Sequence, residues 1–188
     1  NLQDEKRRWK MNKQDLEKVI VIDTETTGLN RKDEILQLSI INGLGKVLLN
    51  EFYKPRHKRF WKRAMAVNGI TPKSTQDKEP MSDSFEKITK ILNNAEVIVG
   101  YNTPFDLNML KHNGIKLRKD IKVHDVMATF MKIKNVRKEN GHLKRFKLAD
   151  CAEYYGFKVE PTEHLHDSLT DVKATLHCYL AIDPKLFA

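Results

Sequence analysis

The chain of 188 residues has the size of one ordinary domain and is long enough to bury a hydrophobic core. Hydrophobic residues make up 40% of it, which excludes an intrinsically disordered chain, and its apolar runs are far too short to cross a membrane. The formal net charge of +9 favours a polyanionic partner, of which nucleic acid is the commonest.

The beginning of the sequence predicts an arm followed by a strand. Residues 1–17 carry charges of both signs and few apolar side chains, so we expect an arm or a short exposed helix ahead of a single domain over residues 18–188. Val19–Ile22 is a run of β-branched residues that ends at Asp23, which is typical of a buried strand.

The rest of the chain predicts two more strands and then strands that alternate with helices. The apolar stretches 34–42 and 47–53 flank a Gly43-Leu44-Gly45 turn and indicate an antiparallel meander. The later patterns predict helices over 82–94, 104–113, 148–155 and 167–181, strands over 97–100 and 122–125, a helix to about residue 132, and a loop over 134–145. This order predicts an α/β domain whose sheet is covered by helices.

Acidic side chains stand where predicted strands end. Asp23 and Glu25 follow the first strand, and residues two apart in extended structure point to the same side. Asp106 lies one turn into the helix after the fourth strand, and His166 and Asp171 lie at the start of the last helix. Taken alone, acids at a strand end more often simply face water, and an acid at a helix start more often simply interacts with the helix dipole. The interpretation therefore depends on their combination.

Together these acids offer hard oxygen ligands, which indicates Mg²⁺ or Mn²⁺ rather than zinc. Two such ions, about 3.5–4 Å apart, stabilise the attacking and leaving oxygens when a phosphodiester is hydrolysed. A histidine is the natural base for the attacking water. His166, just before the last helix, is the candidate base, and His164 is the alternative candidate.

At these positions the sequence resembles the DnaQ-like exonucleases of the DEDD group, in the histidine subclass, which includes the proofreading subunit or domain of bacterial replicative DNA polymerases. The resemblance extends from about Lys18 to Leu180, and Asp167 stands where the tyrosine subclass would need Tyr. The matching blocks are Asp23-Thr24-Glu25-Thr26-Thr27-Gly28-Leu29, Asn102-Thr103-Pro104-Phe105-Asp106 and His166-Asp167-Ser168-Leu169-Thr170-Asp171.

The resemblance implies a ribonuclease-H-like fold with a mixed five-stranded sheet. It also implies a 3′→5′ exonuclease that releases nucleoside 5′-monophosphates from single-stranded DNA in proofreading or repair. In this family pattern Asp23 bridges two metal ions, and Glu25 and Asp171 hold the ion that binds the attacking water. Asp106 supports the second ion, and His166 takes the proton of the water.

The family pattern also implies which residues hold the end of the substrate. Backbone groups in Thr26-Thr27-Gly28-Leu29 hold the 3′ hydroxyl, and side chains there wedge the last base. Asn102 and Phe105 line the same pocket. Tyr101 and Asn68 stand where many members carry His, a departure that removes no metal ligand.

Two basic segments are candidates for further contact with nucleic acid. Residues 54–63 hold six Lys or Arg with Phe60 and Trp61 among them, so phosphates could be neutralised while a ring stacks on a base. The same segment fits the alternative that both rings anchor a helix to the core. Residues 132–147 hold seven Lys or Arg and fit either a mobile loop near the cleft or a solvated loop.

Several functions and settings stay open on the sequence alone. An exoribonuclease is the alternative within the class, because backbone groups can accept a 2′ hydroxyl. A basic nucleic-acid-binding module would need none of the active-site residues, and a DNA polymerase or repair protein could be a partner. Cys151 and Cys178 lack a zinc-site spacing, so we expect buried, reduced thiols in a cytoplasmic protein that does not bind membranes. We expect no secretion signal, although a start at Asn1 leaves open that a leader was removed.

Overall fold

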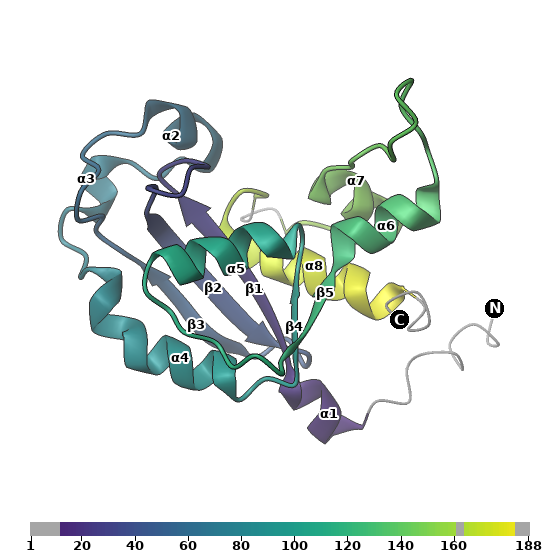
Figure 1. The fold of residues 1–188 in the computed structure, drawn as a ribbon, viewed down its shortest axis with the longest axis horizontal. Coiled ribbons are helices and arrows are strands. Elements are labelled where there is room, and N and C mark those ends of the chain that lie inside the picture. The colour runs from purple at the N-terminus through teal and green to yellow at the C-terminus, as the bar shows by residue number, and fades with distance from the viewer. Residues whose placement is uncertain (1–11, 161–163, 183–188) are drawn as a thin grey trace.

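The computed structural model describes residues 12–160 and 164–182, which form a five-stranded mixed sheet with helices on both faces (Figure 1). The strand order is β3-β2-β1-β4-β5; β2 is antiparallel to β1 and β3, while β4 is parallel to β1 and β5. The strands are β1 (Val19–Thr26), β2 (Ile35–Asn42), β3 (Val47–Phe52), β4 (Val97–Gly100) and β5 (Lys122–Asp125). The predicted α/β class and mixed sheet are confirmed.

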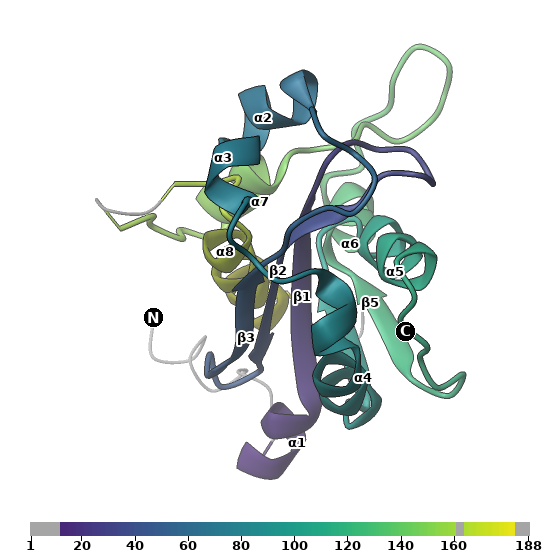
Figure 2. The same ribbon diagram turned by 90° about the vertical axis from the view of Figure 1, so that its left-hand side faces the viewer.

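Two helical layers bury the two faces of the central strands. Even-numbered residues such as Ile20 and Ile22 pack in the core under α4 and α5, and odd-numbered residues such as Val19 and Val21 pack in the core under α8. Figure 2 shows these layers on opposite sides of the sheet. The helices are α1 (Lys13–Lys18), α2 (Lys62–Asn68), α3 (Pro72–Thr75), α4 (Phe85–Asn93), α5 (Thr103–His112), α6 (Val126–Lys134), α7 (Leu148–Tyr154) and α8 (Ser168–Ala181). Because both faces are covered, β1 reads as a continuous apolar run.

The N-terminal arm is partly described. Residues 1–11 of the predicted arm lie outside the described residues, whereas the next stretch forms α1, which Asn12 caps by accepting from Asp15 N. Gly43 N donates to Leu16 O at 2.9 Å, and a Cβ on Gly43 would lie 2.6 Å from that oxygen. The short helix is therefore held against the β2–β3 turn. The division at residue 18 stays a prediction.

The two aromatic residues before α2 have different environments. Trp61 is buried with Leu36 and Ile70, and its Nε1 donates to Ile70 O at 2.7 Å. Trp61 is therefore an anchor for α2, as one interpretation held, whereas Phe60 is 62% exposed. A helix at α2 was expected only under that interpretation, and α3 was not predicted.

Residues 134–145 are more ordered than the predicted loop. Arg137 pairs with Leu143 in an antiparallel bridge, and Lys144 N donates to Val136 O at 2.7 Å. The segment is a basic hairpin that projects between α6 and α7 (Figure 1). At its root, Tyr101 Oη donates to the carbonyls of Phe146 and Lys147.

Cys151 and Cys178 are free and buried, as expected. Among the described residues, no helix combines the length and apolarity that a membrane crossing requires.

Candidate active site

Asp23 and Glu25 lie in the last part of β1, on the side of the sheet that α8 covers. Strand alternation places them on the same side as Val19 and Val21, whose side chains pack in the core under α8. The pairing of β1 with β2 shifts register between Glu25 and Thr26. Such irregularities often re-aim side chains next to a site.

Asp106 reaches the same place from the first turn of α5. The pairing of β4 with β1 stops at Val21 and Val99, before the acidic part of β1. Beyond that point Asp106 Oδ1 accepts hydrogen bonds from Thr24 N at 3.0 Å and from Thr24 Oγ1 at 2.7 Å. Thr24 thus fixes one oxygen of the buried Asp106 carboxylate beside Asp23.

The start of α8 is fastened to β1 and β2. Asp167 caps the helix by accepting from Thr170 N at 3.2 Å, and it also accepts from Gln37 Nε2 at 3.0 Å. Ser168 Oγ donates to the carbonyl of Asp23 at 2.7 Å. These bonds bring the first turn of α8 to the acidic end of β1.

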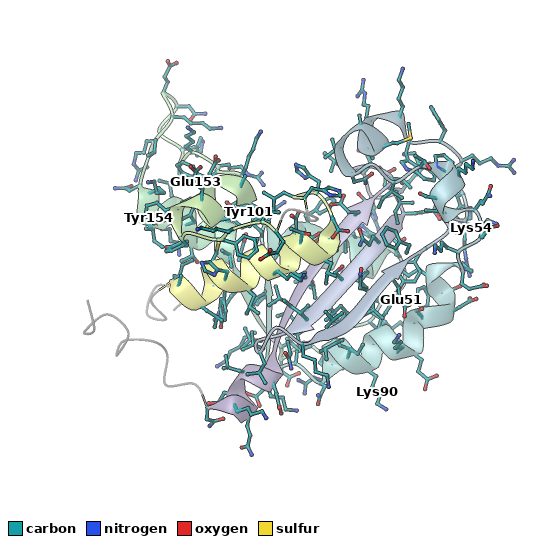
Figure 3. All side chains as sticks on the ribbon, turned by 180° about the vertical axis from the view of Figure 1, so that it is seen from behind. Glu51, Lys54, Lys90, Tyr101, Glu153 and Tyr154 are labelled. Carbon is teal, nitrogen blue, oxygen red and sulfur yellow. The ribbon has the colours of Figure 1, made fainter. Side chains whose placement is uncertain are left out.

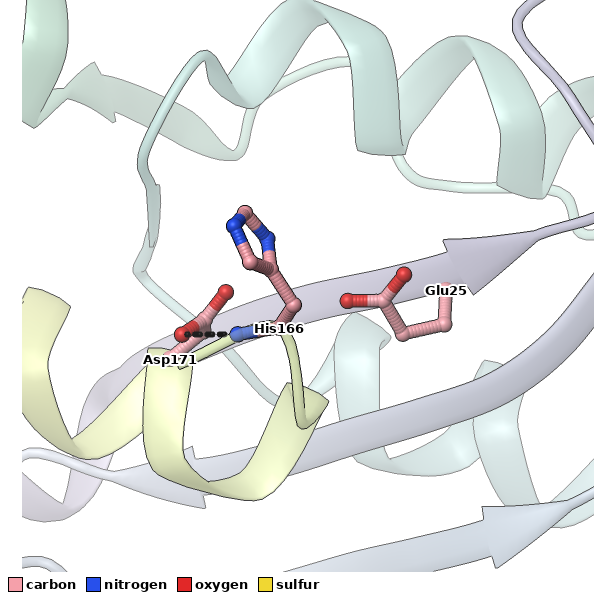
Figure 4. A group of neighbouring side chains, drawn as sticks. All are labelled: Glu25, His166 and Asp171. Atoms are coloured by element: carbon pink, nitrogen blue, oxygen red, sulfur yellow. Dashed lines mark hydrogen bonds between the residues drawn. The ribbon is translucent and has the colours of Figure 1, made fainter. Parts of the chain in front are cut away.

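His166 and Asp171 extend from this helix start toward Glu25. His166 has a left-handed backbone, with φ 71°, and its N–H donates to Asp171 Oδ1 at 3.2 Å. One ligand atom from each of Glu25, His166 and Asp171 lies within 4.8 Å of the others (Figure 4). Asp171 is buried whereas His166 is exposed, so the imidazole is open to an incoming molecule.

The carboxyl groups have raised pKa values. Burial, followed by the charges of Asp106, Asp171 and Glu25, raises the pKa of Asp23 well above its usual range. Burial and the charge of Asp171 raise the pKa of Glu25 to about 8. Burial raises the pKa of Asp106 to about 7, against the hydrogen bonds from Thr24, and that of Asp171 to about 6, against the His166 N–H. The protein thus concentrates negative charge that it does not itself neutralise.

The four carboxyl groups fit divalent cations. Asp23 Oδ2 is buried and accepts no hydrogen bond within the described part of the chain. An unsatisfied buried carboxylate oxygen is unfavourable unless a charge compensates it. Oxygen donors at this density are the ligands that Mg²⁺ and Mn²⁺ prefer.

The residues expected to hold the substrate end lie in the loop after β1 and at the start of α5. Thr26 Oγ1 donates to Gly28 O at 2.7 Å and Thr27 Oγ1 to Asp33 Oδ1 at 2.9 Å, so both hydroxyls hold the loop itself. Leu29 is 83% exposed and therefore available to a base. Asn102 caps α5 with a left-handed backbone, and Phe105 packs against the core. Their roles in substrate binding stay predictions.

Three polar residues support the site although the sequence analysis gave them no role in it or only a minor one. Asn68 is buried, its amide donates to Thr26 O at 3.3 Å, and it lowers the pKa of Glu25. Gln37 and Ser39 hold the start of α8, since Ser39 N donates to Ser168 Oγ at 3.1 Å. Two polar residues, two apart in an otherwise apolar strand, are a signal that could have indicated these contacts.

The remaining sequence hypotheses have mixed outcomes. Asp125 and Asp167 cap α6 and α8. His164 lies close enough to Asp171 to lower its pKa and remains a rival base.

A family model for exonucleases, RNase_T, matches residues 20–179. The chain is 28% identical over 116 residues to DNA polymerase III subunit epsilon of Haemophilus influenzae, a match over 57% of this chain and 45% of the relative. It is 29% identical over 171 residues to RNA exonuclease 4 of Saccharomyces cerevisiae, a match over 86% of this chain and 53% of the relative. The chain thus spans about half the length of these two relatives.

Among solved structures, exonuclease X in complex with 5′ overhanging duplex DNA is similar, with a TM-score of 0.65 and 20% identity. The match covers 86% of this chain and 89% of that one. This likeness supports the ribonuclease-H-like form of the sheet and its helices.

Proposed function

Because the chain belongs to the exonuclease family that the RNase_T model describes, and is DnaQ-like, we propose that it removes nucleotides from the 3′ end of single-stranded DNA. Each cycle releases one nucleoside 5′-monophosphate. The 3′→5′ direction, the preference for single-stranded DNA and the roles of individual residues are parts of this proposal.

Asp23, Glu25, Asp106 and Asp171 would hold two divalent ions, Mg²⁺ or Mn²⁺. When bound, these ions supply the positive charge that stabilises the phosphate as negative charge develops on it. The structural support is that burial raises the pKa of all four carboxyl groups, and that the charges of neighbouring site carboxylates raise those of Asp23 and Glu25 further.

His166 is the proposed base. Its imidazole accepts a proton from the attacking water, whose oxygen forms a bond to phosphorus. The bond between phosphorus and the 3′ oxygen of the preceding nucleotide breaks, and that oxygen takes up a proton. The products are a 5′-monophosphate and a strand with a new 3′ hydroxyl.

The observation that carries the proposal is Asp23 Oδ2, which lies buried near the charges of Asp106, Asp171 and Glu25 and has no hydrogen-bond partner among the described residues. A protein that only bound nucleic acid would gain nothing from keeping this oxygen buried and unpaired. Its basic surface segments would be sufficient to bind the phosphates of a nucleic acid.

The test is release of mononucleotides from 3′-labelled and 5′-labelled single-stranded DNA, and from the RNA counterparts, with Mg²⁺, Mn²⁺ or EDTA. We expect metal-dependent, stepwise shortening from the 3′ end. Asp23→Asn should abolish turnover and leave DNA binding in place, whereas Asp77→Asn, an exposed acid in another part of the chain, should change neither. Absence of release from every polymer with either metal would overturn the proposal in favour of a binding module.

A 3′→5′ exoribonuclease is the second candidate, because one of the relatives is named an RNA exonuclease. The RNA arm of the same assay separates the two substrates by their rates. A DNA polymerase is a possible partner by analogy with the epsilon relative, and co-purification with a polymerase subunit would test it.

A further inference from the structure

A cationic pocket lies beside the β1–β2 loop, and none of the four site carboxylates lines it. Its volume is about 420 Å³, within the usual range for ligand pockets. Its basic side chains come from three segments of the chain and are Arg31, Lys32, Lys54, Arg56, His57 and His112. Figure 3 shows Lys54 on the opposite side of the molecule from Tyr154.

The acids of this pocket do not neutralise its cations. Asp33 binds Lys58 and the backbone N–H of Asn30, and Lys58 is not among the lining residues. The Glu34 carboxylate accepts from the backbone nitrogens of residues 56–58, at 2.6 Å from Arg56 N and 2.8 Å from Lys58 N. Within the described ranges, no salt bridge joins a lining Lys or Arg to an acid. The pocket therefore keeps an excess of positive charge.

The pocket also has apolar walls next to these cations. Pro55, Met81 and Phe85 contribute to its lining, and Phe85 is half-buried. Basic groups beside an aromatic ring suit a phosphate joined to a flat base, because the ring offers a stacking surface.

The pocket is connected to the candidate active site through two elements. The loop that begins with Thr26–Leu29 continues directly into Arg31–Ile35 at the pocket. Helix α5 carries Asp106 near its start and His112 at its end, a rise of about 9 Å.

We propose that this pocket binds the phosphate of a second nucleotide, separate from the one at the four carboxylates. The ligand chemistry is a nucleotide phosphate with its base against Phe85. It comes either from an upstream part of the bound strand or from a free nucleoside monophosphate. The inference rests on the proposed function only for the choice of a nucleotide as the anion.

The test is binding in EDTA, so that no turnover is needed. The variant Lys54→Gln/Arg56→Gln removes two pocket charges, and Lys116→Gln/Lys119→Gln removes two exposed charges outside the pocket as a matched control. Single-stranded oligonucleotide and dAMP are titrated separately over a range of salt concentrations. Thermal unfolding of each variant verifies that it is folded.

If the strand fills the pocket, the pocket variant binds the oligonucleotide roughly tenfold more weakly than the control. The salt slope, which is the slope of the logarithm of the binding constant against the logarithm of salt concentration, then falls in magnitude by about 1.4. If a free nucleotide fills it, dAMP binding falls roughly tenfold while the salt slope for the oligonucleotide stays that of the control. A folded pocket variant that equals the control with both ligands overturns the inference. This binding test does not depend on turnover, so it can be interpreted even if the exonuclease assay contradicts the proposed function.

Discussion

The carboxylates of the candidate site depend on neighbours that hold them in place, and Thr24 is the clearest case. Its hydroxyl and its N–H both donate to Asp106 Oδ1, and both hydrogen bonds lower the pKa of that carboxyl. Thr24→Val keeps the shape and the N–H but removes the hydroxyl. We expect 10–100-fold weaker Mg²⁺ affinity or activity, the usual effect of losing such a partner.

Isothermal titration with Mg²⁺ and the exonuclease rate measure this effect. Thr24→Ser keeps the hydroxyl and should stay close to the wild type. Equal metal affinity and rate in Thr24→Val and the wild type would show that the hydroxyl does not position Asp106.

Gly28 is a second residue-scale case, because the loop closes tightly around Asp33. A Cβ at position 28 would lie 2.6 Å from Asp33 Oδ2, while Asp33 is held by Thr27, Asn30 and Lys58. Gly28→Ala must displace this carboxylate, so we expect a loss of about 1–3 kcal/mol in the free energy of unfolding. Urea denaturation of Gly28→Ala and of the wild type measures this loss. A Gly28→Ala variant as stable as the wild type would mean that the loop yields freely.

At the scale of elements, the sequence predicts the strands well and the short helices poorly. β1, β2 and β4 are runs of β-branched and apolar residues that only a covered sheet explains. Helix α2 is anchored by Trp61, which packs with Leu36 and Ile70 and donates from Nε1 to Ile70 O. Contacts of this kind leave no periodic pattern in the local sequence. The basic hairpin shows no alternation because its side chains face solvent on both sides.

The candidate site divides in the same way. The sequence places Asp106 and Asp171 in the helices where the structure has them, whereas Asp23 and Glu25, expected directly after the first strand, lie within the longer strand β1. Their supports could not be predicted, because Thr24 meets Asp106 across 82 residues and Ser168 meets Asp23 across 145. Such contacts appear only after the sheet and α8 are assembled.

The basic hairpin depends on a contact of this kind with Tyr101. The Tyr101 hydroxyl donates to Phe146 O at 3.0 Å and to Lys147 O at 2.9 Å, and both carbonyls lie at the root of the hairpin. Tyr101→Phe should reduce the free energy of unfolding by about 1 kcal/mol. It should also speed amide hydrogen exchange over residues 135–147, because the root loses its tie.

Hydrogen exchange read by mass spectrometry measures the local effect. Tyr154→Phe is the matched control, because Tyr154 is 53% exposed and its hydroxyl plays no part in this tie. Unchanged exchange over 135–147 in Tyr101→Phe would mean that the hairpin holds its conformation by its own hydrogen bonds.

At the scale of the whole molecule, ionisation of the buried acids destabilises the folded state unless cations are present. The folded pKa values are about 6 for Asp171, about 7 for Asp106 and about 8 for Glu25, whereas unfolded carboxyls titrate at about 4. Between these values the folded state holds more protons than the unfolded state. The free energy of unfolding of the metal-free protein therefore falls as pH rises from about 4 to about 8 and levels off above that.

Divalent cations should reverse this trend, because they bind the ionised carboxylates. We expect Tm in EDTA to fall between pH 6 and pH 8.5, and the gain in Tm from Mg²⁺ to grow over the same interval. Thermal unfolding with and without Mg²⁺ at several pH values measures both trends. Glu25→Gln removes the carboxyl with the pKa of about 8, so its Tm in EDTA should depend less on pH in the upper part of the window. A wild-type Tm in EDTA that stays level or rises over this interval, with no added gain from Mg²⁺, would show that these carboxyls are already neutralised by the protein itself.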